Sequence, residues 1–254
     1  MATDVGRSVS EGPRQYRQLR FSLPANATEV VLVRHGETVP AVDGTLFDLV
    51  DGHGDPELGP EGHLQAEKVA ARLAGEEPDA IYVTNLRRTA ETAAPLAARL
   101  GLEPRVEADL REVLLGEWEG GAYRRHLVDG HPLALELIEK ERWDVIPGAE
   151  SNEAFQERLR RGISRIAAAH VGRRVVAVSH GGAIGMILSM ATGSRPFAFV
   201  GADNGSISRL IVSGGNWSVR GFNEVSHLDS GRRRARVLSS AAFRALRTRT
   251  APSP

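Results

Sequence analysis

Two histidines, His35 and His180, each follow an apolar run and precede a glycine. The runs, residues 30–33 and 175–178, are typical of strands that are covered on both faces in a parallel sheet. Imidazole can act as a nucleophile or move protons near neutral pH, and the glycine allows a sharp turn and a close backbone approach. Because ligands bind outside the carboxyl ends of such strands, we expect the two histidines to share one site.

Arginines accompany these histidines. Arg34 directly precedes His35, while Arg87 and Arg88 follow a third apolar run, residues 80–83, where a helix is expected to begin. A buried arginine is costly unless it meets an anion, its planar guanidinium fits phosphate oxygens, and helix N-termini favour anions. A lone histidine is more often a packed or solvated residue, but two histidines with these arginines predict a pocket for phosphate.

The elements that must position these side chains follow from hydrophobic periodicity and from glycine and proline breaks. Strands are expected near residues 29–34, 80–83, 102–106, 174–179, 207–213 and 217–222, and helices near residues 59–74, 89–100, 132–142, 154–169 and 182–192. Residues 39–58 are predicted to be a loop, and residues 108–150 to be irregular apart from one helix. Alternating strands and helices indicate an α/β fold, a three-layer sandwich with a mostly parallel central sheet.

Composition and charge restrict the class of protein. The chain has no cysteine, which excludes disulfides and thiolate chemistry, and no apolar stretch near the roughly 20 residues of a membrane helix. No secretory signal is visible, so a cytoplasmic protein is expected. Residues 29–228 are predicted to form one domain after a loose N-terminal extension, residues 1–28. Residues 229–254 carry seven arginines and one acid, which predicts a basic, poorly ordered tail, with weak contacts to nucleic acid, anionic lipid or a partner as the alternative.

Six sequence elements, in order, resemble those of the histidine phosphatase superfamily, whose fold is called phosphoglycerate-mutase-like. They are R-H-G-E-T at residues 34–38, a D-x-x-L…G…Q-A segment at 55–66, T-N-L-R-R-T-A-E-T-A at 84–93, an acid segment at 110–120, P-G-A-E-S at 147–151 and S-H-G-G at 179–182. One short motif would be a weak signal, but six in order identify the chain as a member of this family.

The resemblance implies roles for individual residues. His35 is expected to attack phosphorus through one unprotonated ring nitrogen, while an acceptor holds the N–H of the other. Arg34, Arg88 and His180 are expected to share the phosphoryl oxygens, since the matched motif selects the second arginine of the pair. Glu112 is expected to protonate the leaving alcohol and then to activate water.

Further expectations concern the rest of the site. Thr38 and Gly181 belong to the matched segments and are expected to help bind the substrate. The implied reaction uses no metal and no cofactor, because the arginines would neutralise the phosphoryl charge. Four loop residues offer a metal site as an alternative, although solvated loop residues are the simpler interpretation: Asp51, His53, Asp55 and His63.

The sequence departs from the family pattern on one side of the pocket. Ala41 stands where the family often has asparagine, and residues 39–58 contain no arginine. These differences leave the substrate open within the class of small phosphorylated molecules. Five residues of the variable segment could contact it or could equally be solvated: Tyr123, Arg124, Arg125, His126 and His131.

The segment after Glu112 indicates the branch of the family. Its short G-x-W-E-G form and the P-G-x-E-S element resemble the phosphatases rather than the mutases, which have a longer, arginine-rich lid. We therefore expect hydrolysis of phosphomonoesters through a phosphohistidine. Phosphoglycerate mutase activity and a non-catalytic phosphate-binding protein stay open as alternatives. The oligomeric state is undecided, a homodimer included.

Overall fold

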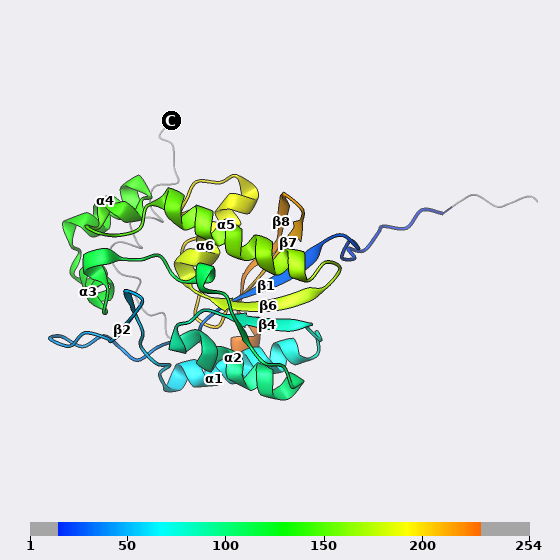
Figure 1. Cartoon of the computed structure of the whole chain (residues 1–254), viewed down its shortest axis with the longest axis horizontal. Helices are drawn as coiled ribbons and strands as arrows, with labels where there is room; N and C mark the ends of the chain where they lie inside the picture. Colours follow the sequence, from blue (N-terminus) through cyan, green and yellow to red (C-terminus); the bar gives the residue numbers. More distant parts are fainter. Residues whose placement is uncertain (1–14, 230–254) are drawn as a thin grey trace, which may run out of the picture.

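A six-stranded sheet lies at the centre of the molecule, in the strand order β5-β4-β6-β1-β7-β8 (Figure 1). The structure is a computed structural model and describes residues 15–229. The strands are β1 (Thr28–Arg34), β4 (Ala80–Val83), β5 (Arg105–Val106), β6 (Arg174–Ser179), β7 (Ile207–Ser213) and β8 (Asn216–Glu224). The ladders β1–β6, β6–β4 and β4–β5 are parallel, whereas β7 and β8 add an antiparallel hairpin at one edge. The predicted α/β fold with a mostly parallel sheet is confirmed.

Helices cover both faces of this sheet and complete the three layers (Figure 1). One face carries α1 (Pro60–Ala74) and α2 (Arg87–Leu100), and the other carries α5 (Asn152–Ala169) and α6 (Gly181–Thr192). Side chains alternate along β1, so that Val31 and Val33 pack toward α1 and α2, while Val30 and Leu32 pack toward α5 and α6. Because both faces are covered, residues 30–33 of β1 and 175–178 of β6 are apolar, as the sequence predicted.

Smaller elements lie beyond the carboxyl ends of the parallel strands. They are α3 (Ala122–Asp129), α4 (Pro132–Lys140) and a short ladder of β2 (Leu49–Val50) with β3 (His53–Gly54). The sequence predicted the second helix but neither the first helix nor the ladder. The first helix follows Gly120 and Gly121, which have positive φ, and it has no side-chain N-cap, so the usual start signal is missing. The ladder strands are too short for periodicity to reveal them.

Three helices, α2, α5 and α6, begin one or two residues earlier than predicted. In α2 and α6, carboxylates from distant residues cap the first turn. The backbone N–H of Arg87, the first residue of α2, donates to Asp55 Oδ1 at 2.7 Å. The first turn of α6 donates to the carboxylate of Glu112. Neither helix has a side-chain cap from its own N-cap residue. A cap from a residue far away in the sequence leaves no local signal at the start of a helix.

Glycines allow β1 and α1 to approach closely beside His35. A Cβ atom on Gly36 would lie 2.5 Å from the carbonyl oxygen of Gly62, and a Cβ atom on Gly62 would overlap the Glu37 carbonyl. Any other side chain would push the strand and the helix apart at both positions. This contact joins two of the matched sequence elements and fixes the turn that carries His35.

The ends of the chain add little to this framework. Residues 1–14 and 230–254 lie outside the described residues, and with them half of the predicted extension and nearly all of the predicted basic tail. Residues 15–27 contain no helix or strand. Between residues 15 and 229, none of the helices combines the length and the apolar character that a membrane crossing requires.

Candidate active site

A cavity of about 220 Å³ opens at the carboxyl edge of the parallel strands. It brings together four of the residues that the sequence predicted to be catalytic: Arg34, His35, Arg88 and Glu112. Side chains from the short ladder, from α3 and from neighbouring loops form the other walls: Phe47, His53, Trp118, Glu119, Tyr123, Arg124 and Trp143. The site therefore combines polar groups at the sheet edge with a largely aromatic rim.

One ring nitrogen of His35 is free to act as a nucleophile. His35 Nδ1 lies 2.7 Å from the Gly36 carbonyl oxygen, which can only accept, so Nδ1 carries the proton and Nε2 keeps its lone pair. Burial, followed by the charges of Arg88 and Arg34, lowers the pKa of His35 well below its ordinary value. The imidazole is therefore neutral at physiological pH, in the tautomer that nucleophilic attack requires.

Arg34 brings an unpaired positive charge to the same place. Its Nη1 donates to the Ala202 carbonyl, while its buried Nε has no hydrogen-bond partner. Gly181 packs against this guanidinium, since a Cβ atom there would lie 3.3 Å from Nε. Burial lowers the pKa of Arg34. A buried guanidinium with an unused donor is stabilised by an anion, so Arg34 favours anion binding in the cavity.

Arg88, rather than Arg87, points into the cavity. The side chain of Arg88 is 9% exposed, against 50% for Arg87. Arg88 Nη1 donates to the Gly54 carbonyl at 2.8 Å, and its nearest carboxylate, Asp55, is 3.9 Å away. Burial lowers the pKa of Arg88 to about 10, so it stays charged at neutral pH. The arginine that the family motif selects is the one that the fold buries.

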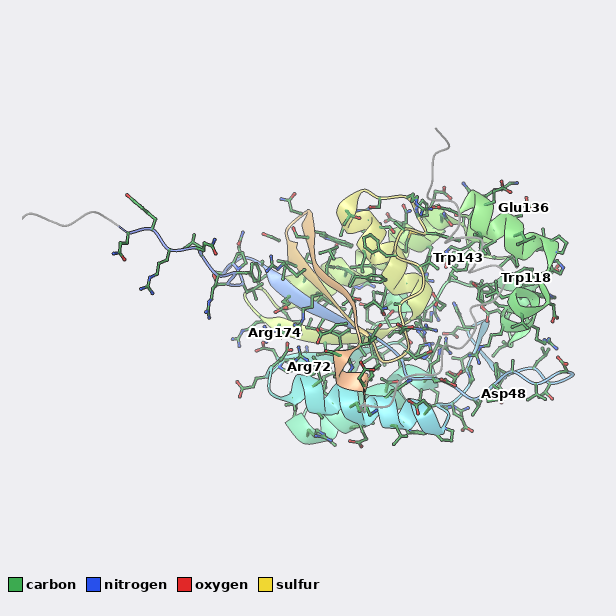
Figure 2. All side chains as sticks on the ribbon, turned by 180° about the vertical axis from the view of Figure 1, so that it is seen from behind. Asp48, Arg72, Trp118, Glu136, Trp143 and Arg174 are labelled. Carbon is green, nitrogen blue, oxygen red and sulfur yellow. The ribbon has the colours of Figure 1, made fainter. Side chains whose placement is uncertain are left out.

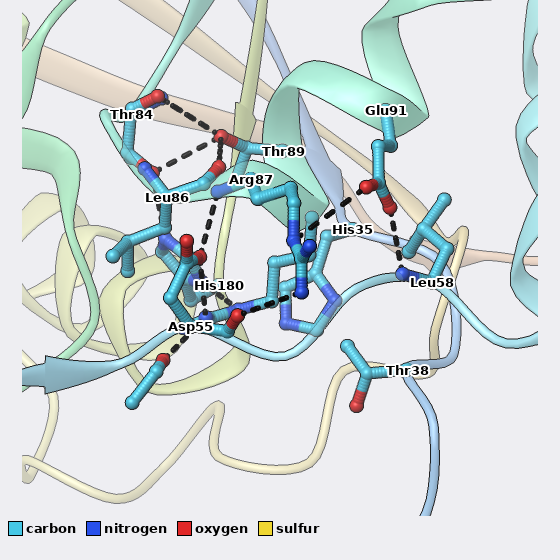
Figure 3. A network of polar contacts seen from close by, with 12 residues as sticks. His35, Thr38, Asp55, Leu58, Thr84, Leu86, Arg87, Thr89, Glu91 and His180 are labelled. Atoms are coloured by element: carbon cyan, nitrogen blue, oxygen red, sulfur yellow. Dashed lines mark hydrogen bonds and ion pairs between the residues drawn. The ribbon is translucent and has the colours of Figure 1, made fainter. Parts of the chain in front are cut away.

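His180 is fully buried. Its ring lies close to that of His35 (Figure 3). Its Nδ1 accepts from Arg88 Nε at 3.3 Å, and its Nε2 lies 3.1 Å from Thr84 Oγ1. The rings of His35 and His180 meet edge to face, with centroids 5.2 Å apart. The two strand-end histidines thus lie side by side. His180 does not line the cavity, however, and its direct contacts are with Arg88 and Thr84, so its role as a phosphate ligand stays a prediction.

Glu112 is held at the N-terminus of α6. Its Oε2 accepts from the Gly182 N–H at 2.9 Å, and its Oε1 accepts from the N–H groups of Ala183 and Val113, both at 3.0 Å. Arg158 donates to the backbone carbonyl of Glu112. Oε2 receives one of these three N–H bonds and is the oxygen with room for a proton. The carboxyl group is therefore fixed at one wall of the cavity.

The neutral histidines predict that the fold is sensitive to acid. Burial, then the charge of Arg88, lowers the pKa of both His35 and His180 well below the ordinary value. In the unfolded chain each titrates near about pH 6.5, so below that pH the unfolded state binds more protons. The free energy of unfolding should fall with decreasing pH, by at most about 1.4 kcal/mol per pH unit for each histidine.

Urea unfolding at about pH 7.5 and about pH 5.5 measures this loss. The variant His35→Ala should lose less stability over the same interval, because it lacks one of the two histidines. The difference between the two proteins reports the contribution of His35. The same pH dependence in both proteins would contradict a neutral, buried His35.

Of the other residues that the sequence predicted to contact substrate, some line the cavity and some do not. Thr38 is buried and does not line the cavity; its Oγ1 accepts from Arg124 Nη2 at 2.6 Å. Of the variable segment, Tyr123 and Arg124 line the cavity. The remaining residues of that segment, Arg125, His126 and His131, do not, and the two histidine rings pack against Trp118 with centroids 4.6 and 5.3 Å away.

Sequence reasoning missed the aromatic rim. Phe47, Trp118 and Trp143 line the cavity, and Figure 2 shows both tryptophans near α3 and α4 at this end of the molecule. Trp118 lies inside a matched motif, and this position was a signal that it could line the site. Phe47 and Trp143 lie in segments without a motif or a clear period, so only the fold reveals them.

The alternative of a metal site finds no support in the arrangement of its residues. Both ring nitrogens of His53 face backbone carbonyls, those of Asp51 and Glu112, each at 3.1 Å. Asp55 caps α2 (Figure 3), and His63 is exposed. Among residues 15–229 there is no group of three or more side chains that could hold a metal ion.

Taken together, fold and site define an α/β protein with a buried histidine and two arginines around one cavity. Residues 30–225 match the histidine phosphatase superfamily (branch 1), and the chain belongs to this family. It is 35% identical over 206 residues to phosphoglycerate mutase-like protein 4 of Arabidopsis thaliana, covering 79% of this chain and 87% of that protein.

Two further relatives are phosphatases. A metal-independent phosphoserine phosphatase of Arabidopsis thaliana is 31% identical over 232 residues, covering 89% of this chain and 94% of that protein. The structure of a mycobacterial glucosyl-3-phosphoglycerate phosphatase is 29% identical, with a TM-score of 0.66, covering 78% of this chain and 99% of that chain. The relatives thus include both phosphatases and mutase-like proteins.

Proposed function

We propose that this protein hydrolyses small phosphomonoesters through a phosphohistidine on His35, without a metal or a cofactor. The observation that carries this proposal is the hydrogen bond from His35 Nδ1 to the Gly36 carbonyl. It leaves Nε2 as an unprotonated nucleophile in a cavity that Arg34 and Arg88 also line. Family membership and the two phosphatases among its relatives support the same function.

In the first step, His35 Nε2 attacks phosphorus and the bond from phosphorus to the alcohol oxygen breaks. Arg34 and Arg88 stabilise the negative charge on the phosphoryl oxygens. These oxygens are the anion that the guanidinium groups need as a partner. Glu112, protonated on Oε2, gives its proton to the departing alkoxide. The products of this step are the alcohol, phospho-His35 and the Glu112 carboxylate.

In the second step, water attacks the phosphorus of phospho-His35. The Glu112 carboxylate takes a proton from this water, the phosphorus–nitrogen bond breaks, and its electron pair returns to His35 Nε2. Inorganic phosphate leaves, and the site is back in its starting state. His180 keeps Arg88 in place throughout by accepting from its Nε.

The first experiment measures phosphate release from an aryl phosphate, from several alkyl phosphates and from phosphoglycerate in the presence of a chelator. Release of inorganic phosphate supports the hydrolase. One relative is named as mutase-like, so mutase activity is the alternative. A mutase would interconvert phosphoglycerates with little free phosphate. Absence of both products over a wide pH range would overturn enzymatic activity and leave a phosphate-binding protein.

The substitution Gly182→Ala should displace the Glu112 carboxyl group. A Cβ atom at this position would overlap Glu112 Oε1 and lie 3.1 Å from its carboxyl carbon. We expect kcat on alkyl phosphates to fall by about 10- to 100-fold, because a small misplacement of a catalytic group is costly. Steady-state kinetics measures the effect. Gly75→Ala is the control, since a Cβ atom there meets nothing within 4 Å, and unchanged kcat in Gly182→Ala would contradict the role of Glu112.

A further inference from the structure

We propose that His53 is a positioning residue for Glu112, and that it acts as a doubly protonated imidazolium. His53 lies on β3, is buried and lines the cavity, but both of its ring nitrogens face the protein backbone. The inference rests on the proposed function for the role of Glu112 as acid and base. It adds the residue that holds the main chain of that acid in place.

The two hydrogen bonds of His53 indicate its charge state. Nδ1 lies 3.1 Å from the Asp51 carbonyl oxygen, and Nε2 lies 3.1 Å from the Glu112 carbonyl oxygen. A carbonyl oxygen can only accept, and a neutral imidazole has one N–H group, so a neutral ring would turn a lone pair toward one of the two carbonyls. Only the imidazolium satisfies both contacts, and hydrogen bonds from a charged donor are stronger than those between neutral groups.

Charges of both signs lie around His53. The Glu119 carboxylate accepts from the N–H of the next residue, Gly54, and Arg88 donates to the Gly54 carbonyl, both at 2.8 Å. After burial and the charges of Arg88 and His35, the charge of His53 contributes to lowering the pKa of His180. A phosphoryl dianion bound at Arg88 would add negative charge beside β3 and stabilise the imidazolium. The other charged groups of the elements packed against β3 are Asp51, Asp55, Arg87, Arg111, Glu112 and Arg158.

The Glu112 carbonyl oxygen is held from two sides. His53 Nε2 reaches it from β3, and Arg158 Nη2 reaches it from α5 at 2.6 Å. Arg158 is itself fixed by a bidentate pair with Glu150, since its Nε and Nη2 donate to the two carboxylate oxygens, both at 2.8 Å. The two donors use both lone pairs of the carbonyl oxygen. The main chain of Glu112 is therefore fixed separately from its carboxylate, which the first turn of α6 holds.

The strand β3 also joins this acid to the phosphate site. His53 binds the main chain of Glu112, and the next residue, Gly54, binds Arg88. Two adjacent residues of one strand thus set the acid and the arginine relative to each other. A general acid must lie within hydrogen-bond distance of the leaving oxygen while the arginines hold the phosphoryl group. Loss of the bond from His53 would remove one of the two donors to the Glu112 carbonyl and loosen the carboxyl group.

The substitution His53→Gln tests this positioning role, because glutamine is neutral and has one nitrogen in place of two. We expect kcat on alkyl phosphates to fall by about 10- to 100-fold, since their leaving groups need a well-placed proton on Glu112. Formation of phospho-His35 from a nitrophenyl phosphate should change by less than about 3-fold, because that leaving group departs unprotonated. Steady-state and stopped-flow kinetics measure the two effects. His63→Gln, which changes an exposed histidine of α1, is the matched control and should behave like the wild type.

Nuclear magnetic resonance measures the charge state and the alignment without turnover. At neutral pH, the ring nitrogens of His53, assigned by their absence in His53→Gln, should show the two nearly equal nitrogen shifts of an imidazolium. The amide signals of Gly182 and Ala183, which donate to the Glu112 carboxylate, should move in His53→Gln and stay unchanged in His63→Gln.

The ratio of alkyl to aryl activity separates the positioning of Glu112 from a general loss of structure. An equal loss with both substrates, or no loss with either, would overturn the positioning role of His53 and leave the proposed function standing. One protonated and one unprotonated ring nitrogen would overturn the imidazolium. If the wild type hydrolyses no phosphomonoester, the proposed function fails, and the amide signals of Gly182 and Ala183 decide this inference: signals that move in His53→Gln support it, and unchanged signals overturn it.

Discussion

Replacement of His35 by alanine is expected to lower kcat for phosphomonoester hydrolysis by at least about 10⁴-fold, since no phosphoenzyme can then form. The other histidine that lines the cavity, His53, has both ring nitrogens beside backbone carbonyls. Arg34 and Arg88 stay charged, and His180 Nδ1 is engaged by Arg88. Phosphate binding should survive in the variant, because the arginines that attract it remain.

Two measurements make this expectation specific. Rapid quench under alkaline conditions, which preserve phosphohistidine, should trap a phosphoenzyme in the wild type and none in His35→Ala. The control His63→Ala removes an exposed histidine of α1 and should leave both activity and the phosphoenzyme unchanged. Appreciable turnover in His35→Ala would show that phosphorus is attacked by another group or by water directly, and the covalent mechanism would fall.

The sequence could predict the framework of this site because its signals are local. Four consecutive apolar residues before His35 and before His180 marked strands that are covered on both faces, and both strands pair in parallel side by side. Ser151 was recognisable as the N-cap of α5, since its hydroxyl accepts from Ala154 N–H three residues on. Such patterns depend on neighbours in the chain, which a sequence displays directly.

The sequence could not predict contacts between distant segments. Asp55 caps α2 and Glu112 caps α6 across more than thirty intervening residues, so neither cap leaves a local signal in the sequence. The wall of the cavity beside residues 39–58 also depends on a contact between distant segments. Residues 39–58 lack an arginine, and the charge on that side comes instead from Arg124 of α3, a helix that the sequence did not predict. The position of such a side chain depends on how two variable segments meet in space.

Substitution of Glu112 by glutamine should separate the two chemical steps. Glutamine has nearly the same shape, and its oxygen can still accept an N–H bond at the start of α6, but it cannot donate a proton to an alkoxide. With alkyl phosphates, whose leaving groups need that proton, we expect kcat to fall by about 10²- to 10⁴-fold. A nitrophenyl phosphate has a leaving group that departs unprotonated, so formation of phospho-His35 should be much less affected.

The aryl substrate therefore gives a distinctive time course. Water activation in the second step also depends on Glu112, so the phosphoenzyme should accumulate in Glu112→Gln. Stopped-flow absorbance should show a burst of nitrophenolate close to one equivalent per site, followed by slow turnover. Glu117→Gln, an exposed acid of the same segment, should behave like the wild type. An equal loss of the first step with alkyl and aryl phosphates would mean that Glu112 only positions α6, and another group would have to supply the proton.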